Sequence, residues 1–154
     1  MRLLLGIILL IICVFIGYIK SNKYYLRKTF YIDFVNFNNT LKEEVFFRQG
    51  TIIDLLKKEN SKNDFYKELN AVFIKNEKFN DAFSYLDKDE ITYFKDYVNK
   101  IGAGDNAVQI KFLEGVSEQV EKKQNQSFLD NDKYKKLYIK LGFFIGLILF
   151  ILVL

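Results

Sequence analysis

Two long apolar stretches lie at the ends of the chain, and a region of mixed apolar and charged residues lies between them. Residues 3–19 read LLLGIILLIICVFIGYI, and residues 137–154 are almost entirely apolar, with Lys140 as their one charged residue. A helix needs roughly 20 apolar residues to cross the hydrocarbon core of a bilayer. Tyr18, Tyr134 and Tyr138 fall near the edges of these stretches, where aromatic side chains favour the membrane interface. The pattern predicts a transmembrane helix at each end.

A cleaved signal peptide is the main alternative for the first stretch. The run ends in GYIKSNK, which contains no small-residue cleavage site. A lipoprotein signal at Cys13 is also disfavoured, because bulky Ile11 and Ile12 stand where small residues are expected. We therefore expect an uncleaved anchor in which Cys13 packs as a small apolar residue. A single cysteine also excludes a disulfide within the chain.

The region between the two stretches, residues 21–136, has the periodicity of helices. In its first part the apolar residues recur at steps of three or four, which places them on one helical face: Leu26, Phe30, Phe34, Phe37, Leu41 and Val45. Gly50 is suited to ending this helix, and the chain has no proline to interrupt it. The sequence predicts an all-α protein, with an antiparallel bundle of five or six helices between an N-terminal and a C-terminal transmembrane helix.

Capping residues mark the expected helix starts in this region. TIID at residues 51–54, SKND at 61–64 and DKDE at 87–90 each place a helix-capping residue three positions before an acidic one. Between the last two starts, a short helix is expected from about residue 80 to 86, with Phe79 and Phe83 facing inward. The last helix is expected to start near Asn106. The pattern leaves open whether it continues unbroken into the second transmembrane stretch.

The stretch IGAGDNAVQ, residues 101–109, has two interpretations. As a helix corner, Gly102 supplies the positive φ wanted just past a helix end, and Asp105 caps the next helix. As a phosphate-binding loop, it would need a preceding strand and a complete glycine motif. Ala107 stands where the third glycine of G-x-G-x-x-G would fall, and the preceding residues have helical period. The helix corner is the favoured interpretation.

The net charge of +4 arises beside the apolar stretches. Residues 29–130 contain 14 basic and 18 acidic residues, so this part is mildly acidic, whereas a nucleic-acid-binding domain concentrates positive charge on one face. Anionic lipid headgroups explain the flanking basic residues better. The positive-inside rule then places the middle domain in the cytoplasm and both termini outside. The flanking residues are Lys20, Lys23, Arg27, Lys28, Lys133, Lys135, Lys136 and Lys140.

The residue inventory does not favour an enzyme. The chain has no histidine, and its one cysteine lies in the first apolar stretch. Asp87, Asp89 and Glu90 are close in sequence, but helix capping explains them better than a metal site. We expect no catalytic residues, no cofactor and no metal, and a scaffold function.

Glycines in the second apolar stretch form a second feature of interest. Gly142 and Gly146 have the G-x-x-x-G spacing that allows transmembrane helices to pack closely. Their face is expected to contact another membrane helix, with the N-terminal one as a candidate. The alternative is that both glycines are merely tolerated in lipid.

The motif at residues 101–109 carries a resemblance to a known family. Gly102, Asp105 and Gln109 match in register the Leu-Gly-x-Ser-Asp-x-x-x-Gln pattern of the stage III sporulation protein AB family, with Ile101 and Gly104 as substitutions. The upstream residues Leu86 and Asp89 and the C-terminal residues Leu137, Tyr138, Gly142 and Gly146 also fit that family. The proline that often follows the first long helix of the family is absent here.

The resemblance implies a role in sporulation. The family's domain is similar to the cytoplasmic helical domains of the platform protein in type II secretion and type IV pilus machines. A member would be a platform subunit of the channel complex between mother cell and forespore, would bind a cytoplasmic secretion-type ATPase and other membrane subunits, and would lie in the outer forespore membrane with its domain in the mother-cell cytoplasm. The alternative function is a stand-alone two-span membrane sensor or regulator of a cell-envelope process.

Overall fold

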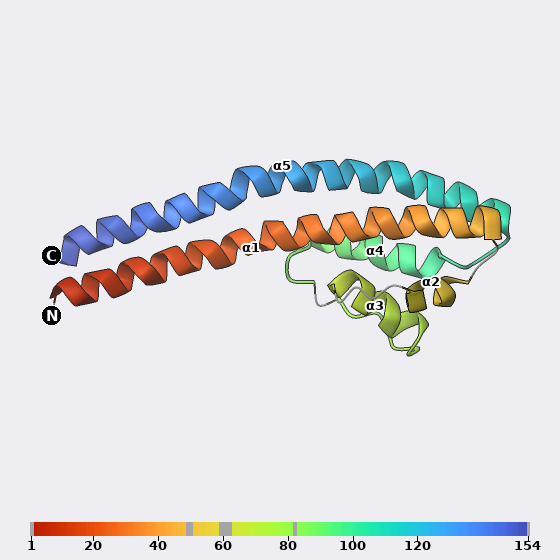
Figure 1. Cartoon of the computed structure of the whole chain (residues 1–154), viewed down its shortest axis with the longest axis horizontal. Coiled ribbons are helices and arrows are strands. Elements are labelled where there is room, and N and C mark those ends of the chain that lie inside the picture. Colours follow the sequence, from red (N-terminus) through yellow and green to blue (C-terminus); the bar gives the residue numbers. More distant parts are fainter. Residues whose placement is uncertain (1, 49–50, 59–62, 82, 154) are drawn as a thin grey trace. The chain divides into compact units, whose positions relative to one another are not determined.

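A computed structural model describes residues 2–48, 51–58, 63–81 and 83–153 of the chain. Their elements are shown in Figure 1: α1 (Arg2–Glu43), the π-helical turn η1 (Glu44–Arg48), α2 (Ile52–Lys58), α3 (Asp64–Phe73), α4 (Lys88–Lys100) and α5 (Asn106–Val153). No strand occurs among these described residues. The predicted all-α fold class is confirmed.

The chain divides into two compact units, and α1 and α5 contribute to both. The span unit consists of Met1–Lys28 and Gln126–Leu154, and the bundle unit consists of Thr29–Asn125. The bundle unit is shorter than the domain expected at residues 21–136. The difference arises because residues just beyond the apolar stretches pack within the span unit: Tyr24 stacks on Tyr134 with ring centroids 5.0 Å apart, and Arg27 pairs with Asp130 at 2.7 Å.

In the span unit, the first part of α1 and the last part of α5 run side by side in opposite directions (Figure 1). Each helix is long and apolar enough to cross a membrane. Their outward faces carry exposed apolar side chains, such as Leu4, Ile8 and Phe15 on α1 and Phe144 and Ile148 on α5. A large apolar surface of this kind fits a membrane protein, because the hydrocarbon of a bilayer can cover it.

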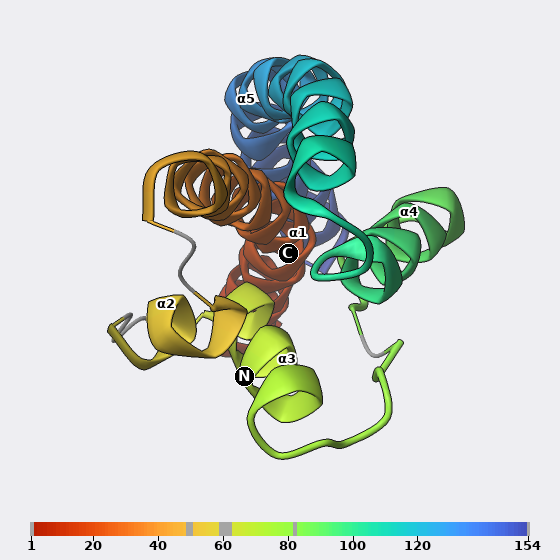
Figure 2. The same cartoon turned by 90° about the vertical axis from the view of Figure 1, so that its right-hand side faces the viewer.

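The bundle unit is built on a core of aromatic rings. Within it, α1 lies between α5 on one side and α2 and α3 on the other (Figure 1, Figure 2). Phe30, Phe34 and Phe65 are almost completely buried, and Phe94 of α4 packs against all three with ring centroids 5.1 to 5.5 Å apart. Most of these pairs are edge-to-face, the geometry that aromatic quadrupoles favour. The apolar stripe on α1 therefore faces this core.

Three local expectations have different outcomes. The short helix expected from about residue 80 to 86 is wrong, because the described residues there form turns, with the Leu86 amide donating to the Phe83 carbonyl at 3.1 Å. Helix α3 begins at Asp64 with Asn63 as its N-cap residue. The expected helix end at Gly50 and the capping residue Ser61 lie outside the described residues.

The question left open for the last helix has a clear answer. Helix α5 runs without interruption from Asn106 to Val153, through both units. The polar segment EKKQNQ at residues 121–126 remains helical. Apolar and small side chains such as Leu113, Val116 and Val120 before it, and Ser127 after it, keep one face buried.

Candidate functional site

The stretch at residues 101–109 forms the corner between α4 and α5. Helix α4 ends at Lys100, and Gly102 and Gly104 follow with φ values of 80° and 92°. These left-handed conformations favour glycine, because a Cβ would strain the backbone. Asp105 precedes α5, and its Oδ1 accepts the Val108 amide at 2.9 Å, as an N-cap residue does. The segment therefore terminates one helix and starts the next.

Gln109 holds the two sides of this corner together. Its side-chain Oε1 accepts the Gly102 amide at 3.1 Å, and its Nε2 donates to the Lys100 carbonyl at 3.0 Å and to the Ala103 carbonyl. The side chain is buried. Helix termini leave backbone groups without intrahelical partners, and the Gln109 side chain bonds to three backbone groups of this corner. Gly102 and Gln109 are thus in direct contact, and Asp105, which lies between them in the chain, caps the start of α5.

A groove of about 420 Å³ lies beside the corner, within the bundle unit. Its walls come from the end of α1, the start of α2 and the corner itself, and they include Leu41, Ile52, Ile101, Gly102 and Gln109. The Gly102 position is tight, since a Cβ there would come within 3.0 Å of the Ile52 side chain. The corner therefore contributes directly to the shape of this surface.

Buried polar contacts connect α1 to α4 and to α5. Glu90 of α4 accepts the Tyr31 hydroxyl at 2.7 Å through Oε1 and the Asp87 amide at 3.1 Å through Oε2. It is both part of the α4 capping box and a partner of α1. The Asn38 side chain donates to the Leu113 carbonyl at 3.1 Å and to the Ser117 hydroxyl at 2.9 Å. Buried hydrogen bonds of this kind fix the register of neighbouring helices.

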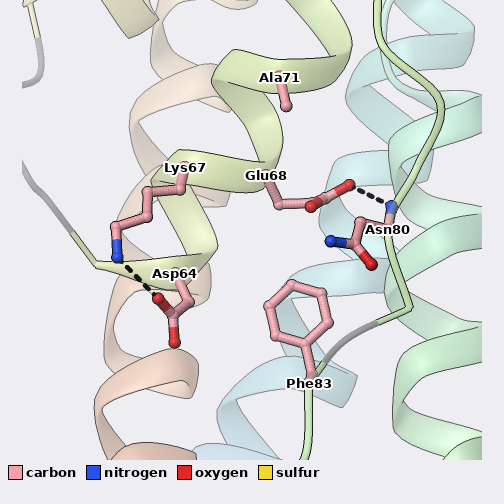
Figure 3. A pocket seen from close by; sticks show the side chains of 6 residues that line it. All are labelled: Asp64, Lys67, Glu68, Ala71, Asn80 and Phe83. Carbon is pink, nitrogen blue, oxygen red and sulfur yellow. Dashed lines mark hydrogen bonds and ion pairs between the residues drawn. The ribbon is translucent and has the colours of Figure 1, made fainter.

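A pocket of about 310 Å³ lies between α3 and the loop that precedes α4 (Figure 3). Glu68 points across it and accepts the Asn80 amide at 2.7 Å, and Phe83 lines the same pocket. Burial raises the pKa of the Glu68 carboxyl above its ordinary value, and the Asn80 amide partly opposes that effect. The Glu68 carboxylate has a structural role: its bond to the Asn80 amide holds a loop before α4, where the sequence predicts a helix.

Gly142 and Gly146 lie in the span unit, against α1. A Cβ on Gly142 would come within 2.7 Å of the Cys13 carbonyl oxygen, and a Cβ on Gly146 within 3.1 Å of the Leu10 Cα. On α1, a Cβ on Gly17 would come within 2.6 Å of the Tyr138 carbonyl oxygen. These glycines allow the two backbones to approach closely, as small residues do in membrane helix pairs.

Side chains that bind metal ions do not cluster in the described part of the chain. No group of three or more histidine, cysteine, aspartate or glutamate side chains that could hold a metal ion occurs among those residues. Cys13 is a free thiol on the helix face that packs against Gly146. Sequence reasoning missed the long-range contacts of four side chains. These contacts join residues at least twelve positions apart in the chain, and they are made by Tyr31, Asn38, Glu68 and Glu90.

Comparison with known protein families identifies a match over the chain. The family model described as Stage III sporulation protein AB (spore_III_AB) matches residues 2–154. No curated protein and no solved structure matches significantly. The similarity extends over essentially the whole chain, including both apolar helices and the corner.

Proposed function

The chain belongs to the stage III sporulation protein AB family, and we propose that it is a non-enzymatic platform subunit of the channel complex between mother cell and forespore. Family membership gives it a role in sporulation. The observation that carries the finer proposal is the arrangement of the chain: two helices that fit a membrane bracket one bundle unit with its own aromatic core. That arrangement suits a subunit that holds a folded domain at a membrane.

In this proposal the bundle unit lies in the mother-cell cytoplasm. The basic residues of the span unit support this orientation, since they cluster on the bundle-unit side of both apolar stretches. Both termini then lie on the opposite side of the outer forespore membrane. A reporter enzyme fused after Leu154 should be active only outside the cytoplasm, and activity confined to the cytoplasm would overturn this orientation.

The proposed partners are a cytoplasmic secretion-type ATPase and other membrane subunits of the channel. The support is the resemblance to the family, which implies a domain similar to that of the platform protein in type II secretion and type IV pilus machines. The bundle unit is mildly acidic and has a folded core, so it suits a protein partner better than nucleic acid. Binding, rather than turnover, is the expected activity.

The decisive experiment is recovery of the complex from sporulating cells. An affinity tag would be inserted between Glu77 and Lys78, which are exposed in the loop after α3. Cells would be crosslinked through sporulation, the membranes solubilised, and copurifying proteins identified by mass spectrometry. We expect a secretion-type ATPase and other membrane subunits in the tagged sample.

Two controls make the result specific. An untagged strain reports background, and a strain with a tagged, unrelated two-span protein reports general membrane crosslinking. Recovery of the ATPase in the test sample alone supports the platform function. If the ATPase is present in the cells and is never recovered, the platform proposal fails.

A further inference from the structure

An apolar groove of about 260 Å³ runs along one side of the close helix contact in the span unit. Helix α1 lines it with Ile16, Gly17 and Lys20, and α5 lines it with Tyr138, Leu141 and Ile145. Ile16, Leu141 and Ile145 are exposed, so the groove opens to the surroundings of the two helices. Gly17 and Gly142 line the groove where the two backbones approach closely.

The groove is apolar at one end and polar at the other. Because the helices are antiparallel, with Gly17 beside Gly142 and Cys13 beside Gly146, Ile16 is level with Leu141, and Ile145 lies about one turn closer to Leu10. Lys20 and Tyr138 lie about one turn away in the other direction, toward Lys28. The polar character continues in that direction with the stacked rings of Tyr24 and Tyr134 and with the Arg27–Asp130 ion pair. An amphipathic molecule would match this gradient.

We propose that this groove binds a phospholipid with an anionic headgroup, with an acyl chain between Ile16 and Ile145 and the phosphate at Lys20. The helices that form it fit a membrane, where acyl chains are the surrounding solvent. An apolar cavity does not favour water. A lysine ammonium is a point-charge binder of phosphate, and Tyr138 suits the headgroup level of a bilayer.

Charge complementarity selects an anionic lipid over a zwitterionic one. Residues 20–28 and 126–140 contain eight basic and two acidic residues, and one of the acidic residues, Asp130, is paired with Arg27. Basic pockets between membrane helices recognise anionic headgroups. Lys20 is the basic residue that lines the groove. Lys28 and Lys135 instead lie over the rings of Phe128 and Tyr25, at 4.4 and 5.4 Å.

The proposal goes beyond the platform function and needs no partner protein for its test. The purified full chain would be reconstituted in phosphatidylcholine vesicles with a trace of phosphatidylglycerol that carries a photoactivatable diazirine in its acyl chain. We expect crosslinks that map to Ile16, Leu141 and Ile145. Unlabelled phosphatidylglycerol should compete about fivefold better than phosphatidylcholine, the factor that one lysine near an anionic headgroup contributes.

Matched variants separate a site from general surface charge. Lys20→Gln should reduce crosslinking about fivefold, and Lys20→Arg should retain it. Lys140→Gln removes the same charge from an exposed position of the same unit that does not line the groove, and should leave crosslinking unchanged. Ile145→Phe fills the groove without a change of charge and should also reduce crosslinking.

Several results would overturn the proposal. Equal losses in Lys20→Gln and Lys140→Gln would indicate surface charge alone, and equal competition by the two lipids would remove the headgroup preference. Unchanged crosslinking in Ile145→Phe would place the lipid elsewhere. Displacement of the probe by inorganic phosphate would identify a free-anion site. Because the chain is tested alone, none of these outcomes bears on recovery of the ATPase.

Discussion

The span unit and the bundle unit use opposite kinds of residues to bring helices together. In the bundle unit, large rings fill the space between helices, and Phe34, Phe65 and Phe94 are at most 1% exposed. In the span unit, the contact is made by Gly17, Gly142 and Gly146, while large side chains such as Phe144 point outward at 60% exposure. The same two helices, α1 and α5, follow both rules along their length.

The difference follows from the solvent that each unit is suited to. In water, burial of apolar area stabilises a fold by about 25 cal/mol per Å², so large aromatic side chains give the greatest gain. In a bilayer, lipid tails are as apolar as leucine, so helix pairing depends on close backbone packing, for which small residues are needed. Replacing a large side chain should therefore harm the bundle unit, and introducing one should harm the span unit.

The largest expected effect comes from removal of a central ring of the bundle unit. Phe94→Ala should lower the free energy of unfolding by about 3–5 kcal/mol, because it deletes a buried ring and leaves a cavity. The ring contacts Phe30 and Phe65, each at 5.1 Å between centroids. The measurement is guanidinium unfolding of the full chain in mild detergent, followed by near-ultraviolet circular dichroism. Phe144→Ala, on the exposed face of the span unit, is the matched control and should change little.

The next effect comes from introducing bulk between the spanning helices. Gly142→Leu should lower the free energy of unfolding by about 1–3 kcal/mol, the usual range for overpacking. The reason is that a Cβ at this position already meets the Cys13 carbonyl oxygen at 2.7 Å. Gly115→Leu is the control in the same helix, since a Cβ there has no neighbouring atom within 4 Å. If Gly142→Leu and Gly115→Leu lower the free energy of unfolding equally, Gly142 is not needed for close packing.

A disulfide gives an independent measure of this contact. A Cβ at Gly146 would lie 3.2 Å from the Cβ of Cys13, a little shorter than the spacing of bridged cysteines, so a small shift of the helices would allow the bond. Gly146→Cys should therefore form an intrachain bond on mild oxidation, and addition of Gly142→Leu should slow it. Phe144→Cys, which is exposed, should form no such bond. Absence of the Gly146→Cys bond would contradict the packing of this unit.

A smaller effect is expected at the corner of the bundle unit. Gln109→Leu removes the hydrogen bonds to Gly102 and Lys100. It should lower the free energy of unfolding by about 1 kcal/mol for each of these bonds that water does not replace. Hydrogen exchange should rise at residues 100–109 and remain unchanged in the span unit. Gln119→Leu, at an exposed position of α5, is the control. Unchanged exchange at the corner would show that Gln109 does not hold it.

The parts of the fold that could be predicted are those set by local residues. Helix α2 starts after Thr51, which caps it: the Asp54 amide donates to the Thr51 hydroxyl at 3.2 Å. Helix α4 starts at the Asp87–Glu90 capping box. The corner likewise follows from Gly102 and Asp105, whose backbone and side-chain preferences act within a few residues.

The parts that could not be predicted depend on contacts between distant residues. Phe79 and Phe83 have helical spacing, but Glu68 binds the Asn80 amide and the segment folds as a loop with both rings against Phe94. The bonds from Tyr31 to Glu90 and from Asn38 to Leu113 join different helices. Local periodicity carries no information about such pairs, because their partners are chosen only when the helices pack.

The smallest expected effect is on the pH dependence of unfolding, and it comes from Glu68, a buried ionisable side chain of the bundle unit. Burial raises the pKa of Glu68 in the folded chain above its ordinary value, so folding favours the protonated carboxyl. The stability from this group is therefore fully present below the pKa of the unfolded chain and is lost as pH rises through the folded pKa. Glu68→Gln keeps an acceptor for the Asn80 amide and should remove this part of the pH dependence of unfolding.

The measurement is guanidinium unfolding of the full chain over a pH series that begins below the ordinary carboxyl pKa and ends at neutral pH. The Glu68→Gln variant should lose less stability than the parent chain as pH rises. Glu118→Gln makes the same change at an exposed position of α5 and should follow the parent. Identical pH profiles for the parent and Glu68→Gln would mean that the carboxylate is hydrated in the fold. The loop before α4 would then be held by Phe83 and its neighbouring rings rather than by Glu68.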